Sequence, residues 1–236
     1  MSEQNRFEIE EQQERWVGGW LKWCPTSPSL LREAEKALLS NLKSAYSVRD
    51  VNVGDCIGKE ESYIWTIILN EDSPKILIVF LHGFGCGWVF FFFFNFDSIA
   101  AHGPVYAFDT IGFGRSLRPA FSKDPIEAER EFIITIEAWR EKMNLNKFTL
   151  LGHSFGGFLA ASYAIKYPER IEHLILAEPW GLSERPVDGY RYNGGFWVKP
   201  ICIILEYFNP FFIVRAAGPL GPKLLQKVRP DLRQIF

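Results

Sequence analysis

The pentapeptide GHSFG at residues 152–156, of the form G-x-S-x-G, constrains the fold of this chain more than any other feature. The apolar residues 148–151 before it predict a strand, and residues 156–167 after it predict a helix. A serine between such a strand and such a helix is typical of a nucleophile elbow, a tight turn that exposes the hydroxyl at the carboxyl end of a central strand. We therefore predict that Ser154 is a nucleophile and not a serine of an ordinary loop.

Glycines beside the serine and in a second loop belong to the same prediction. Gly152 and Gly156 allow the backbone to pass through the elbow without Cβ clashes. Residues 82–87 form a glycine-rich loop after an apolar strand. With such an elbow, this loop supplies one backbone N–H to the oxyanion, and the residue after the serine supplies the other. The predicted oxyanion donors are Phe84 and Phe155.

The groups that would activate Ser154 are not evident in the sequence. His173 is the only histidine after the serine, and it begins the predicted strand 171–177, at the end away from the elbow. We therefore do not expect it to be the base. Glu178 lies at the correct end of this strand and is a candidate acid in a variant arrangement. His82 ends another strand and is expected to hydrogen-bond its own loop. The sequence thus predicts a nucleophile without an evident base, and poor ester hydrolysis by this chain.

Strands and helices alternate between residues 47 and 181. This alternation predicts an α/β fold with a mostly parallel sheet and helices on both faces, and with the elbow it indicates the α/β-hydrolase fold. Residues 182–236 are rich in Pro, Gly, Phe and Trp and are predicted to form an incomplete cap or lid, with the last strands of the fold missing. The predicted strands are 48–53, 63–69, 76–81, 105–109, 148–151 and 171–177.

Two helix starts carry capping residues. Asp124 and Glu127 predict an N-cap and a capping-box glutamate for a helix that runs to about residue 143. Ser27 is predicted to cap another helix, over about 30–42.

Composition excludes several classes of protein. The chain has 26 Lys and Arg against 28 Asp and Glu, with no basic block, so we expect no nucleic-acid partner. Its four cysteines form no C-x-x-C pair, so we expect neither a zinc site nor a thioredoxin-like site. The predicted serine chemistry implies no metal and no organic cofactor. The first residues are polar and no apolar run reaches the ~20 residues of a spanning helix. A cytoplasmic protein is the expectation.

Aromatic residues make up 16% of the chain, and two groups of them are candidates for contact with lipid. Trp16, Trp20 and Trp23 lie on one face if their segment is helical. We interpret residues 1–46 as a lipid-anchoring segment, and packing of these tryptophans on the domain is the alternative. The run Phe90–Phe94 is either a lipid-facing patch or an artefact of the sequence.

Further motifs make the pattern specific. They lie in residues 19–27 (GWLKWCPTS), 82–85 (HGFG), 108–119 (FDTIGFGRSLRP), 152–160 (GHSFGGFLA), 178–181 (EPWG), 217–219 (AGP) and 229–231 (RPD). On these motifs the chain resembles the α/β-hydrolase-domain-containing proteins of subfamily 4/5 over nearly its whole length. That subfamily has a lyso-N-acylphosphatidylethanolamine lipase branch and a lipid-droplet branch described as lipase coactivator and lysophosphatidic acid acyltransferase.

The resemblance implies a serine hydrolase acting on acyl esters of lysophospholipids or N-acylphosphatidylethanolamines, with lysophosphatidic acid acyltransferase activity as related chemistry. It implies a protein peripheral on lipid droplets or membranes, with a lipase or a droplet coat protein as partner. The alternative is a non-enzymatic droplet protein that coactivates a triglyceride lipase. Ser154 favours the lipase branch. The resemblance implies Ser at this position in the lipase branch and Asn in the coactivator branch. The family's late acid and terminal H-x-x-x-x-D segment have no counterpart here, so the resemblance implies a truncated product, an alternative isoform or an incomplete gene model.

Overall fold

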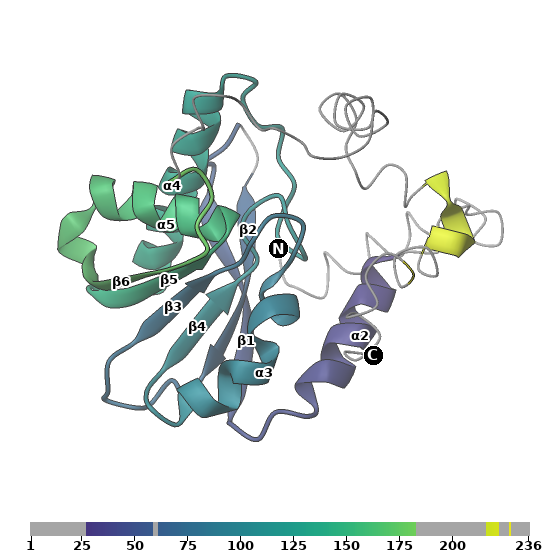
Figure 1. Cartoon of the computed structure of the whole chain (residues 1–236), viewed down its shortest axis with the longest axis horizontal. Helices are drawn as coiled ribbons and strands as arrows, with labels where there is room; N and C mark the ends of the chain where they lie inside the picture. The colour runs from purple at the N-terminus through teal and green to yellow at the C-terminus, as the bar shows by residue number, and fades with distance from the viewer. Residues whose placement is uncertain (1–26, 59–60, 183–215, 222–226, 228–236) are drawn as a thin grey trace, which may run out of the picture. The chain divides into compact units, whose positions relative to one another are not determined.

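The computed structural model describes residues 27–58, 61–182, 216–221 and 227 (Figure 1). The chain divides into two compact units, and the unit Glu35–Glu184 contains the whole described sheet. Trp16, Trp20 and Trp23 lie outside the described residues, as does most of the predicted cap. Their assignments, and the domain boundaries after residues 46 and 181, therefore stay predictions.

A six-stranded sheet is the centre of this unit, with the strand order β1-β2-β4-β3-β5-β6. The first two strands form an antiparallel hairpin, and β2 also pairs antiparallel with β4. The other neighbours pair parallel, which confirms the mostly parallel sheet. The strands are β1 (Tyr46–Gly54), β2 (Ser62–Leu69), β3 (Ile78–Leu81), β4 (Val105–Phe108), β5 (Phe148–His153) and β6 (Ile171–Ala177).

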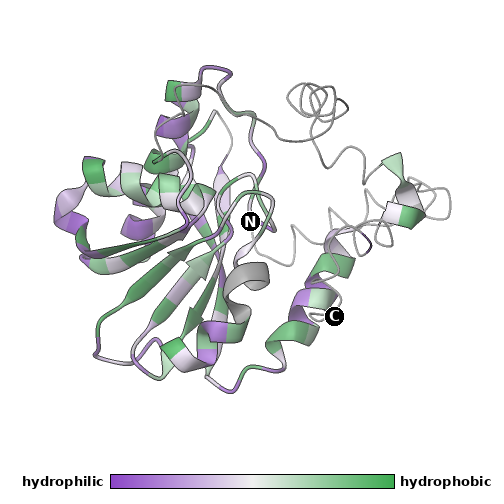
Figure 2. Cartoon of the chain, in the orientation of Figure 1, coloured by the Kyte–Doolittle hydropathy of each residue, from purple (hydrophilic) through white to green (hydrophobic). Residues whose placement is uncertain are grey.

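Helices cover both faces of the sheet, as the alternation predicts. Successive residues of β2 alternate between two buried clusters: Ile64 and Ile68 belong to one, and Trp65 and Ile67 to the other. The first cluster contains residues of α4 and α5, and the second contains residues of α2 and α3. Figure 2 shows the central strands as mostly hydrophobic. The helices are α2 (Pro28–Leu39), α3 (Trp88–Ala100), α4 (Pro125–Lys142) and α5 (Phe155–Lys166), with the 3-10 turns η2 (Pro168–Arg170) and η3 (Gly218–Leu220).

The start of α4 agrees with the sequence in one respect and differs in another. Asp124 is the N-cap, and its carboxylate accepts hydrogen bonds from the backbone N–H groups of Ile126 and Glu127 at 3.0 and 2.9 Å. The predicted capping box is wrong, because the Glu127 carboxylate pairs with Arg130 at 2.8 Å. The Asp124 N–H donates instead to the hydroxyl of Ser122 at 3.2 Å, so it does not need the glutamate.

The predicted cap of α2 is confirmed, since the Ser27 hydroxyl accepts a hydrogen bond from the Leu30 N–H at 3.1 Å. The helix ends at Leu39, three residues earlier than predicted. The Phe90–Phe94 run lies within α3, where Phe94 is exposed. Whether this run is a lipid-facing patch stays a prediction.

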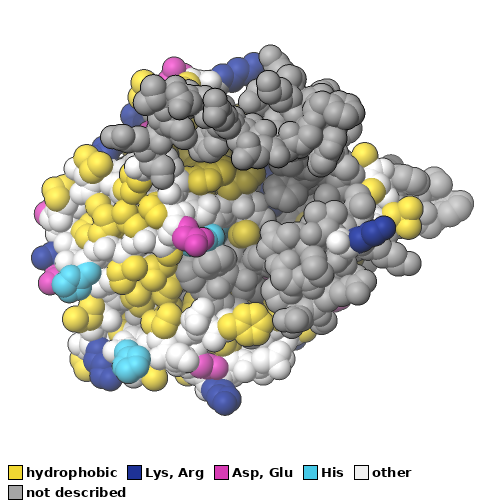
Figure 3. Space-filling model, in the orientation of Figure 1, with side chains coloured by type: hydrophobic (Ala, Val, Ile, Leu, Met, Phe, Trp, Pro, Cys, Tyr) yellow, Lys and Arg dark blue, Asp and Glu magenta, His cyan; other side chains and the backbone are white. Residues whose placement is uncertain are grey.

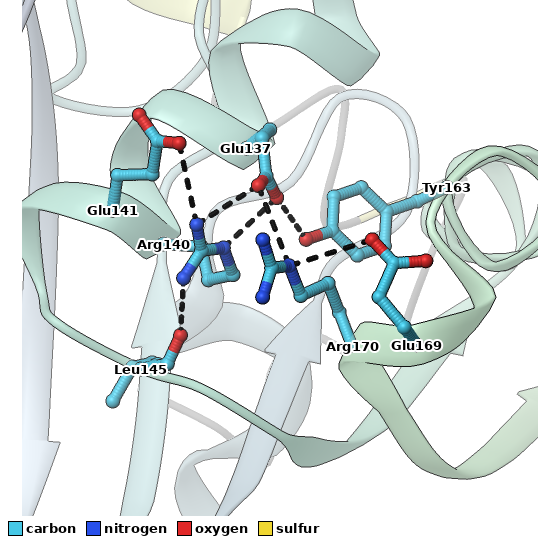
Figure 4. A network of polar contacts seen from close by, with 7 residues as sticks. All are labelled: Glu137, Arg140, Glu141, Leu145, Tyr163, Glu169 and Arg170. Atoms are coloured by element: carbon cyan, nitrogen blue, oxygen red, sulfur yellow. Dashed lines mark hydrogen bonds and ion pairs between the residues drawn. The ribbon is translucent and has the colours of Figure 1, made fainter.

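A polar network joins α4 to α5 and η2 (Figure 4). The Arg140 guanidinium makes two hydrogen bonds of 2.9 Å to the Glu137 carboxylate, which also accepts the hydroxyl of Tyr163 on α5. Burial and the neighbouring Glu137 raise the pKa of Tyr163 well above its ordinary value, so it stays a neutral donor. Arg170 of η2 approaches the same carboxylate at 3.6 Å. The network fixes α5, the helix that follows Ser154, against its neighbour.

The last described strand, β6, has one neighbour in the sheet, β5. Leu174 and Ile175 of β6 and Ile165 of α5 are exposed. Figure 3 shows hydrophobic side chains over this part of the molecule. Among the described residues, no helix is long and apolar enough to cross a membrane.

Candidate active site

The turn between β5 and α5 holds Ser154 in a backbone conformation that L-residues rarely adopt, with φ 53° and ψ −117°. Backbone hydrogen bonds hold this conformation. The Ser154 N–H donates to the Ala177 carbonyl at 3.0 Å, and its carbonyl accepts from Gly157, Phe158 and Trp180 at 2.9, 3.1 and 3.0 Å. A strained residue that its surroundings fix in this way is typical of a functional site.

The predicted elbow glycines lie where a larger residue does not fit. A Cβ on Gly152 would overlap the backbone of Gly156, and a Cβ on Gly156 would overlap the carbonyl oxygen of Leu81 at the end of β3. The start of α5 therefore packs directly on the end of β3 because these residues have no side chain. This arrangement supports the elbow role predicted for both glycines.

We expect Gly156→Ala to destabilise the protein by about 1–3 kcal/mol, because the new methyl must push two backbone segments apart. Urea unfolding checks this value. Ile165→Ala in the same helix is the control, since the Ile165 side chain is 83% exposed and its loss changes stability by about 0.5 kcal/mol or less. Equal stabilities of the two variants would show that the elbow relaxes around the methyl.

The glycine-rich loop after β3 runs directly beside the elbow. A Cβ on Gly83 would lie 3.2 Å from the Ser154 Cβ and 2.9 Å from the His153 Nδ1. The phenyl rings of Phe84 and Phe155 are 6.3 Å apart, edge to face. The structure therefore places Phe84 and Phe155 close to each other and beside Ser154. Their role as backbone oxyanion donors stays a prediction.

His82, fully buried, is engaged at both ring nitrogens. Its Nδ1 lies 2.8 Å from the Gly83 carbonyl oxygen, and its Nε2 accepts the Thr110 N–H at 2.9 Å. The ring therefore donates from Nδ1 and is neutral, and burial lowers its pKa. His82 ties the start of its loop to the segment after β4, in agreement with the sequence.

Asp109, which the sequence analysis did not single out, organises the same two loops. Its carboxylate accepts the N–H of Trp88 at the start of α3 at 3.0 Å and the N–H of Arg115 at 2.8 Å. A Cβ on Gly87 or Gly114 would collide with this carboxylate. The signal in the sequence is a strand-end aspartate followed by G-x-G at residues 112–114.

The other histidines do not reach the serine hydroxyl. His173 pairs with Thr149 at the start of β6 and is exposed, and His102 follows α3, next to the amino end of β3. His153 precedes Ser154, and burial lowers its pKa. Within the part of the chain that the structure describes, no imidazole hydrogen-bonds to the Ser154 hydroxyl.

Glu178 follows β6 at the same sheet edge as the elbow, exposed and with φ 46°. Its role as an acid stays a prediction. Among the described residues, no group of three His, Cys, Asp or Glu side chains is arranged to hold a metal ion.

Comparison with known proteins places the chain in a family. Residues 76–194 match the model of the alpha/beta hydrolase fold family. The chain therefore belongs to the alpha/beta hydrolase fold family, as its elbow and its sheet indicate.

Two groups of curated relatives confirm the resemblance to subfamily 4/5. The (lyso)-N-acylphosphatidylethanolamine lipase of Homo sapiens is 42% identical over 232 residues, which cover 97% of this chain and 66% of the relative. The 1-acylglycerol-3-phosphate O-acyltransferase ABHD5 of Mus musculus is 43% identical over 228 residues, which cover 92% of this chain and 62% of the relative. The chain thus spans somewhat less than two thirds of the length of these relatives.

Solved structures support the fold alone. The 2-hydroxy-6-oxo-6-phenylhexa-2,4-dienoate hydrolase of Rhodococcus sp. strain RHA1 superposes with a TM-score of 0.52 at 20% identity, covering 62% of this chain and 51% of that one. A bacterial membrane phospholipase A superposes with a TM-score of 0.51 at 20% identity, covering 66% and 46%.

Proposed function

We propose that the protein is a serine hydrolase of acyl esters, with lysophospholipids or N-acylphosphatidylethanolamines as substrates and Ser154 as the nucleophile. The observation that carries the proposal is the strained Ser154 backbone at the carboxyl end of β5, beside the loop that contains Phe84. The names of the relatives that are 41–43% identical supply the substrate class.

In this proposal the Ser154 Oγ attacks the ester carbonyl carbon, and the carbonyl oxygen becomes an oxyanion. The backbone N–H groups of Phe84 and Phe155 donate to it, and one such donor is worth about 3–4 kcal/mol of transition-state stabilisation. The C–O bond to the leaving alcohol then breaks, the alcohol leaves with a proton, and water releases the acyl group from Ser154 as a fatty acid. The start of α5 adds a favourable dipole for the negative charge.

Acyl transfer is a second candidate, favoured by the similarity to an acyltransferase. In this chain the transfer would pass through the same acyl group on Ser154, with the hydroxyl of lysophosphatidic acid in place of water as the acceptor. No metal or organic cofactor is needed for either reaction.

The test is release of fatty acid from lyso-N-acylphosphatidylethanolamine by the purified chain and by Ser154→Ala, with and without lysophosphatidic acid as acceptor. We expect fatty-acid release that depends on Ser154. If the protein also transfers the acyl group, an acylated form of lysophosphatidic acid is expected when this acceptor is present. Equal rates for the two proteins would contradict the proposal. They would favour the non-enzymatic lipid-droplet protein that coactivates a lipase.

We further propose that Trp16, Trp20 and Trp23 anchor the protein on a droplet or membrane surface. Tryptophan prefers the boundary between headgroups and acyl chains, and three on one face give shallow insertion. We expect the triple Ala variant to lose flotation with artificial lipid droplets and the parent's binding to depend weakly on salt. The matched control is the triple Phe variant, which keeps aromatic contact. If the Ala variant floats like the parent, the anchor lies elsewhere, with the Phe90–Phe94 run as the next candidate.

A further inference from the structure

Three aromatic side chains form a continuous apolar surface beside Ser154, which we name the aromatic wall: Phe84, Phe155 and Trp180. The Phe84 and Trp180 rings stack with centroids 6.0 Å apart and an interplanar angle of 23°. Phe155 meets both of them edge to face, at 6.3 and 6.2 Å. Phe84 and Trp180 remain 46% and 55% exposed, so the wall presents large apolar faces to its surroundings.

The backbone after β6 fixes Trp180 in this place. Glu178 has φ 46°, a conformation that is uncommon for a residue with a side chain, and the Trp180 N–H donates to the Ser154 carbonyl at 3.0 Å. A Cβ on Gly157 would lie only 2.9 Å from the Pro179 Cβ, so the turn sits closely on α5. Strain at Glu178 and the bond to Ser154 show that the position of Trp180 is set by the elbow itself.

A second layer of rings supports the wall. Phe113, Phe132 and Phe158 lie 6.1, 5.5 and 6.3 Å from the ring of Phe155. Phe113 also meets Phe84 at 5.7 Å. The wall therefore has a packed base, which keeps its exposed rings in place.

We propose that the aromatic wall binds the acyl chain of the ester, and that Trp180 determines specificity for long chains. This inference rests on the proposed function, because it takes the backbone N–H groups of Phe84 and Phe155 as the oxyanion site. A carbonyl oxygen held there places the first methylene groups of the acyl chain beside the rings of the same two residues. Trp180, stacked on Phe84, extends the surface to methylene groups farther along the chain.

The chemistry of the wall selects the acyl chain over the headgroup. A phosphate or an amine requires charged or hydrogen-bonding partners, whereas aromatic faces bury methylene groups at about 25 cal/mol per Å². The occupant that the wall fits is therefore a saturated or unsaturated hydrocarbon chain that begins at the carbonyl carbon held beside Ser154.

Binding of non-hydrolysable ether lipids tests the inference without requiring turnover. Dodecyl-ether lysophosphatidylcholine and its hexyl-ether analogue are titrated calorimetrically, below their micellar concentrations, into the parent and Trp180→Ala. We expect Trp180→Ala to weaken binding of the dodecyl ether about 10-fold and to change hexyl-ether binding about 2-fold or less, because only the longer chain reaches the indole. Trp180→Phe is expected to retain most of the dodecyl affinity. Ile165→Ala, exposed on α5, is the control for loss of an apolar side chain elsewhere.

Unchanged dodecyl binding in Trp180→Ala, with an unaltered melting temperature, would overturn the inference. So would an equal loss for both chain lengths, which would indicate a general effect on the site. Loss of binding to phosphatidylcholine vesicles with monomer binding intact would identify the wall as a membrane-contact surface and would also overturn it. Fatty-acid release that depends on Ser154 is measured separately, with the same protein preparations and lyso-N-acylphosphatidylethanolamine as the substrate. Binding that depends on chain length, without fatty-acid release, would contradict the proposed function but not the acyl-chain site. Fatty-acid release without a dependence of binding on chain length would contradict only the acyl-chain site.

Discussion

Hydrolysis of a lysophospholipid by this chain is expected to be about 10²- to 10⁴-fold slower than by a serine lipase with a complete Ser-His-acid triad, because a general base contributes that factor. Ser154, the proposed nucleophile, has the strained elbow backbone and lies beside the glycine loop. Among the described residues, no imidazole hydrogen-bonds to the Ser154 hydroxyl. His82 is engaged at both nitrogens, and His173 lies at the far end of β6.

The dependence of the rate on pH distinguishes this expectation from a hidden base. The Ser154-dependent rate is the parent's rate minus that of Ser154→Ala, measured between about pH 5.5 and about pH 9. Without an imidazole base we expect this rate to rise steadily with pH, with no step at or below the ordinary histidine pKa of about 6.5. Because burial lowers the pKa of His153, a step at or below that value, at a rate typical of lipases, would contradict the prediction. Disappearance of this step in His153→Asn would then identify His153 as the base, with Glu178 as the acid that pairs with it.

Much of the fold could be predicted because its signals are local. The strand Ile171–Ala177 has the predicted bounds, and α4 begins and ends within a residue of those predicted. Apolar runs, caps and prolines act within a few residues, so the sequence records them directly. The capping box at Glu127 was wrong because Ser122, another local group, took the N–H that the glutamate would have used.

The residues that assemble the site from different loops could not be predicted in the same way. The elbow is a five-residue motif, so Ser154 could be singled out. Asp109 contacts Arg115 locally, but its contact with Trp88, 21 residues earlier, requires β3 and β4 to lie side by side in the sheet. Trp180 follows β6 and Phe84 follows β3, and the two lie side by side because both strands pair with β5. This strand order is a property of the whole sheet.

Glu35 is another residue whose contacts could not be predicted from the sequence. Its partners Trp65 and Arg115 lie 30 and 80 residues away along the chain. This carboxylate on α2 is 6% exposed and pairs with Arg115 at 2.9 Å. It also accepts the indole N–H of Trp65 at 3.0 Å, and the Arg115 guanidinium lies 3.5 Å from the centre of the same indole. The three side chains form a buried cluster that ties α2 to β2 and to the loop after β4.

Glu35→Ala is expected to lower the free energy of unfolding by about 3–5 kcal/mol, because it removes the buried carboxylate that pairs with Arg115 and accepts the Trp65 N–H. Glu35→Gln keeps a side-chain oxygen for these donors, so we expect a clearly smaller loss. Urea unfolding at pH 7 measures both. Equal losses would show that the charge itself, rather than the acceptor, stabilises the cluster.

The pH dependence of the same pair tests the cost of burying Glu35. Burial raises the pKa of Glu35, and the attraction of Arg115 offsets this only in part. The folded state therefore binds the Glu35 proton more readily than the unfolded state. The resulting stabilisation is fully present below the unfolded glutamate pKa of about 4.3 and is lost as the pH rises through the folded value. We expect the unfolding free energy of the parent to increase relative to Glu35→Gln as the pH falls from about 7 toward about 5. A parent that instead loses stability relative to Glu35→Gln over this range would show that pairing with Arg115 outweighs burial and holds the carboxylate ionised.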